Sequence, residues 1–236
     1  VQSFGCGIGF EKINRRILKY YWSDDMNQAT RSAIIIRVIS TMSLILAIAC
    51  GCLGEAAYWA FPEQQGFRTI LKIITAFGIV LFALCRQMRQ GRKQYLLLAA
   101  IVSACLADVV IVHLFPAGVA LFAIAHICLI IVFCRKEPLH KTDWIIWIAI
   151  SIAVVTMILI LGSGMGIYAY GAAVYAPVLL LMAVSAVRQK GRIRMAGILF
   201  FSSDLLLAIY QWKQIHPVIH ILYMGLFYAA LILLPG

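Results

Sequence analysis

The sequence predicts an all-α membrane protein, a polytopic bundle of eight transmembrane helices with both termini in the cytoplasm. Three observations predict this class. Of the 236 residues, 64% are hydrophobic and only 12% are charged, whereas the apolar fraction of a soluble domain is nearer one half. The apolar residues form eight stretches of roughly the 20 residues that a helix needs to cross a bilayer. Finally, the basic residues gather at alternate ends of these stretches.

The eight stretches are joined by short loops, so we expect one membrane domain over residues 33–236. Each stretch should be a helix, because an open sheet in lipid would leave backbone groups without hydrogen bonds. The fourth and eighth begin at or just before Pro116 and Pro217, and proline suits a first helical turn because it lacks only a donor that is unpaired there anyway. The expected spans are 33–54, 67–85, 94–113, 116–134, 144–162, 166–187, 195–212 and 217–235.

The loop charges predict the orientation of the bundle. Basic residues concentrate in the N-terminal segment and in every second loop, and the positive-inside rule places these parts in the cytoplasm. They are Lys12, Arg15, Arg16, Lys19, Arg31, Arg86, Arg89, Arg92, Lys93, Arg135, Lys136, Lys141, Arg188, Lys190, Arg192 and Arg194. The net charge of +11 therefore follows from topology and does not indicate nucleic-acid binding. We expect an integral, multi-pass protein of the cell membrane or of an endoplasmic-reticulum-type membrane.

A basic segment, residues 1–32, precedes the first span. Over residues 10–22 the apolar side chains share one helical face and the basic side chains lie largely on the others. This pattern is typical of a helix that lies on the inner leaflet, and a simple basic anchor is the alternative. We therefore treat residues 1–32 as a cytoplasmic or interfacial segment.

Five polar side chains from five expected helices reach a similar depth in the bilayer. Asp108 and Asp204 each lie roughly 12–14 Å below the outer end of their helix, at about 1.5 Å per residue. His126, Tyr175 and Tyr228 come to the same level from three further helices. A charge at the bilayer centre costs at least ~2.5–3.5 kcal/mol on insertion scales, so such residues normally face the bundle interior and mark a functional site. The structural alternative is a hydrogen-bonded cluster in which the two aspartates and His126 contact one another and fix helix packing.

Two carboxyl groups in an apolar cavity have a definite chemical use. Burial and mutual repulsion favour a state in which one group is protonated and the other is ionised, which pairs a general acid with a general base. Glycosidases use such a pair to protonate a leaving oxygen and to direct water at an oxocarbenium-like centre. A vinyl ether reacts in a related way, because protonation of its carbon gives the same kind of cation.

The spacing of these residues resembles that of the YhhN-type lysoplasmalogenase family. The stretch "ADVVIV…FPAGVALFAIAH" is similar to the family pattern Gly-Asp-x-x-Leu followed by Phe-x-x-Gly-x-x-x-Phe-x-x-x-His. The matching residues are Asp108, Phe115, Gly118, Phe122 and His126.

Later parts of the chain extend the resemblance, which runs from about residue 67 to the end. "YAPVLLLMA", beginning at Tyr175, resembles a Tyr-x6-Met-Ala element. "FFSSDLLLA", with Ser203 and Asp204, resembles Phe-x-x-Ser-Asp-x-x-Leu-Ala, and "FYAALILLPG", with Tyr228, resembles the closing Tyr-Tyr-x-Ala-Gln helix. The sequence departs from the family pattern at Ile73, Ala107, Leu129 and Leu231.

The resemblance implies an intramembrane hydrolase that cleaves the vinyl ether of a lysoplasmalogen, a lysophospholipid, to a fatty aldehyde and a glycerophospho-ethanolamine or -choline. It implies no cofactor and no metal. One of Asp108 and Asp204 would protonate the vinyl carbon and the other would activate water, while His126 positions water or tunes the pair. The expected substrate-binding residues are Lys72, Tyr175, Ser203 and Tyr228. Lys72 stands for the Lys-Pro of the family, and its charge suits the lipid phosphate; ordinary snorkelling to the headgroups is the alternative.

Two other functions stay open from the sequence. His113, His216 and His220 lie near the outer boundary, and the i, i+4 spacing in "HPVIH" can bind zinc, which would suit a metal-dependent lipid hydrolase. A proton-coupled transporter could use the two aspartates as a relay, and its helices should then be broken near the bilayer midplane. The sequence does not predict an oligomeric state.

Overall fold

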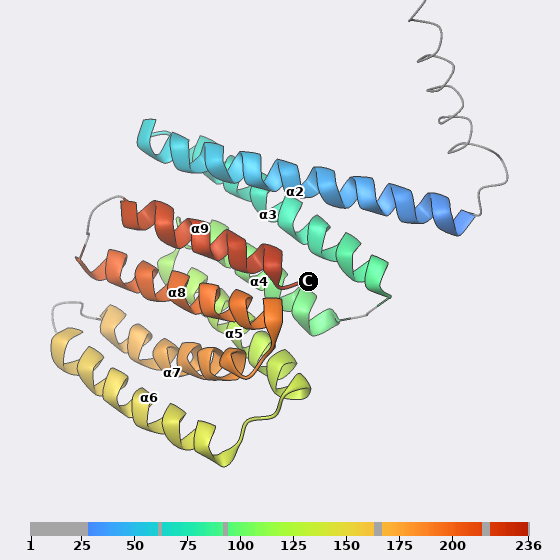
Figure 1. The fold of residues 1–236 in the computed structure, drawn as a ribbon. Coiled ribbons are helices and arrows are strands. Elements are labelled where there is room, and N and C mark those ends of the chain that lie inside the picture. Colours follow the sequence, from blue (N-terminus) through green and yellow to red (C-terminus); the bar gives the residue numbers. More distant parts are fainter. Residues whose placement is uncertain (1–27, 61–62, 92–93, 163–166, 214–217, 236) are drawn as a thin grey trace, which may run out of the picture.

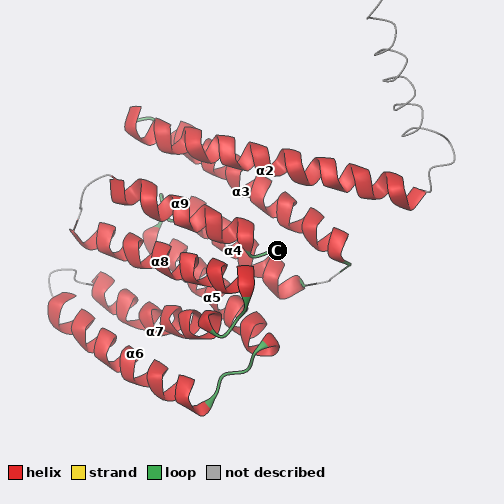
Figure 2. Ribbon diagram, in the orientation of Figure 1, coloured by secondary structure: helices red, strands yellow, loops and turns green. Residues whose placement is uncertain are grey.

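Eight α-helices follow one another in the computed structural model of the protein, and the residues described contain no strand (Figures 1 and 2). The structure describes residues 28–60, 63–91, 94–162, 167–213 and 218–235. The helices are α2 (Gln28–Ala60), α3 (Gln65–Gln90), α4 (Tyr95–Val110), α5 (Phe115–Lys136), α6 (Lys141–Leu161), α7 (Ile167–Val187), α8 (Gly191–Lys213) and α9 (Val218–Leu233).

The all-helical prediction is confirmed, and each of the eight expected stretches overlaps one helix. α2 begins at Gln28, so the last residues of the expected N-terminal segment already belong to the first helix. The amphipathic segment 10–22 lies outside the described residues. α4 ends at Val110, earlier than the predicted residue 113, because the chain turns there and starts α5 at Phe115.

Six helices are long and apolar enough to cross a membrane: α2, α3, α5, α6, α7 and α8. α4 and α9 are apolar helices of 16 residues each, which rise about 24 Å. Large apolar side chains on the outside, such as Ile145, Ile152 and Ile160 of α6, are more than 60% exposed, which suits contact with lipid chains rather than water. The protein is an integral, multi-pass membrane protein.

Helices that are consecutive in the chain pack in pairs, α2 with α3, α4 with α5, α6 with α7 and α8 with α9. α3 also packs on α4, α7 packs on α5 and α8, and a smaller contact joins α3 to α9. In Figure 1, α2 and α6 lie at opposite edges of the bundle, with α8 and α9 between them. The main core is built mostly by α3, α4, α5, α7, α8 and α9, and Ala47 of α2 also belongs to it.

The α4–α5 pair is held by a close approach at its turn. A Cβ atom on Gly118 would lie only 2.5 Å from Cβ of Ile111, so glycine lets the first turns of α5 pack directly against the end of α4. The proline expected to start this helix occupies its first turn. This hairpin brings Asp108 of α4 and His126 of α5 into the same interior.

Candidate functional site

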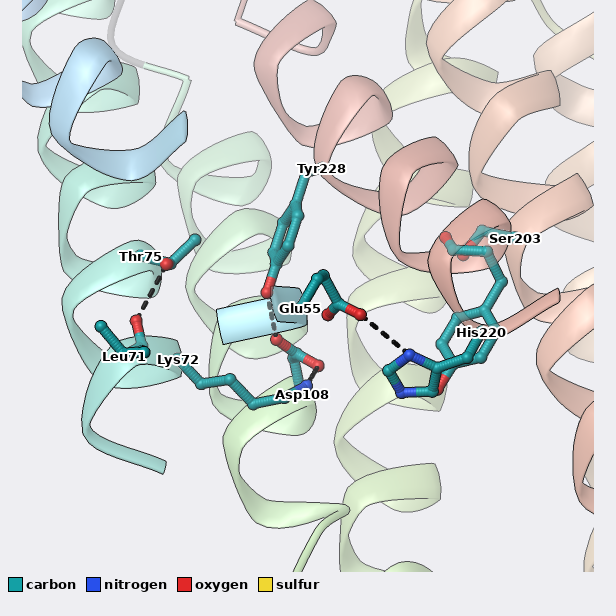
Figure 3. Close-up of polar contacts among 9 residues, drawn as sticks. Glu55, Leu71, Lys72, Thr75, Asp108, Ser203, His220 and Tyr228 are labelled. Carbon is teal, nitrogen blue, oxygen red and sulfur yellow. Dashed lines mark hydrogen bonds and ion pairs between the residues drawn. The ribbon is translucent and has the colours of Figure 1, made fainter. Parts of the chain in front are cut away.

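Asp108 is buried near the end of α4 and accepts hydrogen bonds from two neighbouring helices. Nζ of Lys72, from α3, donates to its Oδ1. The hydroxyl of Tyr228, from α9, donates to its Oδ2 at 3.0 Å, and Figure 3 shows both side chains converging on Asp108. Both carboxylate oxygens are thus satisfied, and the ammonium group balances the negative charge.

Asp204 is equally buried in α8, but it has different partners. Its Oδ2 accepts a hydrogen bond of 2.5 Å from the hydroxyl of Tyr175 and lies 2.7 Å from Nε2 of His126. The Tyr175 oxygen also lies 3.0 Å from the same His126 nitrogen. Oδ1 of Asp204 has no hydrogen-bond partner among the described residues.

His126 is fully buried, and its two ring nitrogens have different surroundings. Nε2 faces a carboxyl oxygen, whereas Nδ1 has no partner among the described residues. An imidazolium would bury an unpaired Nδ1–H, and a buried donor without a partner costs about 1–3 kcal/mol or more. The neutral tautomer that carries its proton on Nε2 donates to Asp204 and leaves Nδ1 as an acceptor with no N–H to satisfy.

The two aspartates line the same cavity, which has a volume of about 210 Å³. Lys72 and Ser203 also line it, whereas His126, Tyr175 and Tyr228 do not and lie behind the carboxyl groups that they contact. The five polar groups expected at one depth are therefore divided into two clusters that share a cavity. Among the described contacts His126 contacts Asp204 but not Asp108. The three side chains therefore do not form the single hydrogen-bonded cluster of the structural alternative.

All four expected substrate-binding side chains have protein partners, since Tyr175 and Tyr228 donate to the two aspartates. Lys72 contacts Asp108, so its charge is balanced within the protein. The Ser203 hydroxyl donates to the backbone carbonyl of Tyr223 at 2.9 Å, which links α8 to α9. The sequence could have predicted that Lys72 and Asp108 pair, because an unpaired charge at this depth in the membrane is costly.

Three phenylalanines from three helices form an apolar wall beside the clusters. The ring centroids of Phe122 (α5), Phe200 (α8) and Phe227 (α9) are 5.5–6.4 Å apart in edge-to-face contacts. The ring of His126 lies 4.8 Å from that of Phe200. Phe122 and Phe227 line the cavity, so carboxyl groups and apolar rings face the same space.

Several residues at the outer end of the cavity were not predicted from the sequence as part of the site. Arg68, His220 and Tyr223 line it, and Nδ1 of His220 lies 2.9 Å from Oε2 of Glu55 on α2. Arg68 lies four residues before Lys72, a spacing that places both on one face of a helix. That spacing is the feature of the sequence that could have placed Arg68 beside Lys72 in the site.

The described residues contain no group of three or more histidine, cysteine, aspartate or glutamate side chains placed to hold a metal ion. Nε2 of His113 lies 3.1 Å from Oγ1 of Thr69, His220 contacts Glu55, and His216 lies outside the described residues. The part of the chain that the structure describes therefore offers no ligand set for the metal-dependent alternative.

The helices that carry the site are continuous. α7 runs through Pro177, whose carbonyl accepts a 2.9 Å hydrogen bond from Nε1 of Trp147. α4 and α8 hold the aspartates without interruption. The broken helices typical of a secondary transporter are thus not found in the described part of the chain.

Comparison with known proteins gave a family match that covers the region of the site. A family model described as the YhhN family matches residues 67–235, a range that covers α3 to α9 and all six side chains of the two clusters. A search of curated proteins and a search of solved structures each gave no match. The family match spans more than half of the chain and includes the whole site, so this protein belongs to the YhhN family.

Proposed function

We propose that this protein hydrolyses the vinyl ether bond of lysoplasmalogens within the membrane, releasing a fatty aldehyde and a glycerophospho-ethanolamine or -choline. One observation carries the proposal: Asp108 and Asp204 line one cavity in an apolar bundle, each with a different set of partners. Vinyl ether hydrolysis needs a proton delivered to carbon and a base for water, which two such carboxyl groups supply. Membership of the YhhN family supports the proposal.

The hydrogen bonds favour Asp204 as the acid. With His126 neutral, an ionised Asp204 would be a buried charge with no cationic partner among the described residues, which is costly. A protonated Asp204 buries no net charge, and its Oδ2 can still accept from Tyr175 and His126. Asp108 beside the Lys72 ammonium is ionised and suits the base.

The catalytic cycle then returns both aspartates to their starting protonation states. Asp204 gives its carboxyl proton to the vinyl carbon distant from the ether oxygen, and the double-bond electrons form the new C–H bond. Asp108 takes a proton from water as the water oxygen bonds to the oxocarbenium carbon, which gives a hemiacetal. Asp204 then takes the hemiacetal hydroxyl proton, Asp108 protonates the departing glycerol oxygen, and both residues return to their starting states.

The size of the cavity fits the reacting end of the lipid. Its volume of about 210 Å³ is below the roughly 300–1,000 Å³ of pockets that enclose a whole drug-sized ligand. The vinyl ether and glycerol would occupy it, while the rest of the hydrocarbon chain extends into the bilayer. The apolar wall of Phe122 and Phe227 suits the first carbons of that chain.

An aldehyde-release assay on the purified full-length protein tests this function. Asp108→Asn and Asp204→Asn should each lower kcat for a lysoplasmalogen by about 10²- to 10⁴-fold, the usual contribution of a general acid or base. Glu137→Gln, a carboxylate-to-amide change at the end of α5 and away from the cavity, should retain the wild-type rate. In D₂O the aldehyde should carry deuterium at its α-carbon, because that carbon receives the catalytic proton.

Two results would count against the proposal in different ways. Wild-type protein that releases no aldehyde would show that the substrate is wrong. A folded aspartate variant that works at the normal rate would show that the assignment of that residue is wrong.

A further inference from the structure

The outer end of the cavity is lined by charged and aromatic side chains that the proposed chemistry does not use. Arg68 and His220 line both the main cavity and a small adjoining space, which Glu55 and Gly54 also line. Tyr210 and Tyr223 line the main cavity beside them. In Figure 3, Glu55 points toward His220 close to the Lys72–Asp108 pair, so this end of the cavity adjoins the proposed reaction centre.

The charges at this end are of both signs and come from different helices. Arg68 brings a second positive charge to this end, one helical turn closer to the start of α3 than Lys72. Glu55, at the outer end of α2, brings a carboxylate whose Oε2 lies 2.9 Å from Nδ1 of His220. A cation and an anion that border one space suit a ligand that itself carries both charges.

The spacing between Arg68 and the reaction centre matches the lipid proposed as substrate. Four residues of helix separate Arg68 from Lys72, a rise of about 6 Å. In a lysophospholipid the bonds from phosphorus through glycerol to the vinyl carbon extend over roughly 7 Å, since three backbone bonds span about 3.8 Å. A vinyl ether held at Asp108 would therefore place its phosphate at the level of Arg68, whose planar guanidinium binds phosphate oxygens in pairs.

An aromatic cluster lines the same cavity as Arg68 and offers a place for the amine of the headgroup. The ring centroids of Tyr210 and His220 are 5.6 Å apart, those of His220 and Tyr223 are 4.9 Å apart, and those of the two tyrosines are 5.9 Å apart. Aromatic faces attract ammonium groups, and the Glu55 carboxylate provides the opposite charge.

We infer that Arg68 and Glu55 form a headgroup subsite that selects a zwitterionic phospho-amine lipid: Arg68 binds the phosphate, and Glu55 binds the ammonium beside the Tyr210 and Tyr223 rings. This inference rests on the proposed function for the position of the vinyl ether. It also assigns a role to α2, because Glu55 precedes the part of the chain that matches the family.

Substrate ratios measured on single preparations test the subsite. The substrates share one alkenyl chain and carry a phosphoethanolamine, a phosphate alone or no headgroup on the glycerol. Arg68→Gln should lower the kcat/KM of the phosphoethanolamine lipid relative to the alkenylglycerol by about 10- to 100-fold, the range for hydrogen bonds to charged groups. Glu55→Gln should lower the preference for phosphoethanolamine over phosphate alone by about tenfold. A ratio does not depend on the fraction of folded protein, so partial unfolding cannot produce either change.

Arg89→Gln is the matched control, because Arg89 is exposed in the last turn of the same helix and does not line the cavity. Both ratios should be unchanged in it. An unchanged ratio in Arg68→Gln or in Glu55→Gln would overturn the inference. The aldehyde-release assay on the wild type would still test the proposed function by itself.

Binding of the free headgroup tests the subsite independently of the reaction. Glycerophosphoethanolamine should bind the wild-type protein in calorimetry, and Arg68→Gln and Glu55→Gln should each weaken it at least about tenfold. Inorganic phosphate should bind much more weakly, because it lacks the ammonium group. Equal binding of inorganic phosphate, or equal binding by all variants, would overturn the subsite whatever the protein does to vinyl ethers.

Discussion

Asp108 and Asp204 are the same residue type in the same cavity, and their neighbours give them different chemistry. A lysine and a tyrosine contact Asp108, so its negative charge is balanced. A tyrosine and a histidine contact Asp204, and no lysine or arginine is paired with it among the described ion pairs. The difference arises from the side chains one layer behind the cavity surface.

Loss of the Lys72 charge should destabilise the protein. Lys72→Met would leave the Asp108 carboxylate buried without its cation, and breaking a buried ion pair in this way costs about 3–5 kcal/mol. Adding Asp108→Asn removes the stranded charge, so the double variant should recover most of the lost free energy of unfolding. Denaturant unfolding in detergent micelles measures both values. A single variant as stable as the wild type would show that the Asp108 charge does not depend on Lys72.

Tyr175→Phe should slow the reaction without unfolding the protein. The change removes one of two hydrogen bonds to Oδ2 of Asp204, and a hydrogen bond contributes about 0.5–1.5 kcal/mol, so kcat should fall by up to about tenfold. Tyr170→Phe is the control, because Tyr170 lies on the same helix and is 67% exposed. If Tyr175→Phe kept the wild-type kcat, its hydroxyl would have no part in orienting the acid.

At the scale of helices, close approaches between α7 and α8 fix where Tyr175 and Asp204 lie relative to each other. Gly197 of α8 packs against Ala186 of α7, and a Cβ on Gly197 would overlap the Ala186 Cβ. The two helices can therefore lie this close only with a very small residue at one of these positions.

Gly197→Ala should therefore separate α7 from α8 and destabilise the protein by about 1–3 kcal/mol, as overpacking does. The swap Gly197→Ala with Ala186→Gly moves the methyl group to the other helix and should restore much of the stability. Gly225→Ala is the control, since a Cβ added there would meet nothing within 4 Å and replacing a helical glycine gains about 0.5–1 kcal/mol. Thermal unfolding of the wild type and these three variants measures this, and a swap no better than the single variant would contradict it.

At the scale of the whole molecule, the cavity opens among helix ends that the loop charges assign to the outer side. Arg68 lies in the first turn of α3, His220 in the first turn of α9, and Gln211 in the last turn of α8. The basic loops follow α3, α5 and α7 at the other end of the bundle. A lipid headgroup would thus enter from the outer leaflet.

Reporter fusions should confirm that orientation. Green fluorescent protein fused at the C-terminus or inserted after Glu137 should fluoresce, because the positive-inside rule places both points in the cytoplasm. Alkaline phosphatase inserted after Leu114, in the loop between α4 and α5, should be active. Active phosphatase at the C-terminus would reverse the topology and move the cavity to the inner leaflet.

Much of the site was predictable because buried charges in a membrane are costly. Asp108, Asp204 and His126 stand out in apolar runs, and helical rise places them at one depth. Arg68, Glu55 and His220 lie near helix ends, where polar residues cost little free energy, so burial cost does not mark them as part of the site. Their contacts depend on which helix ends meet.

The sequence by itself determined that this protein is a membrane bundle of helices and which buried groups can do acid–base chemistry, because hydropathy and helical rise act along the chain. Only the tertiary structure decided that Lys72 neutralises Asp108, that His126 and Tyr175 contact Asp204, and that both carboxyl groups line one cavity. These pairings depend on the rotation and packing of helices distant in the chain. Apolar residues surround helices such as α6 and α7 on all faces, so local patterns do not fix how these helices are rotated.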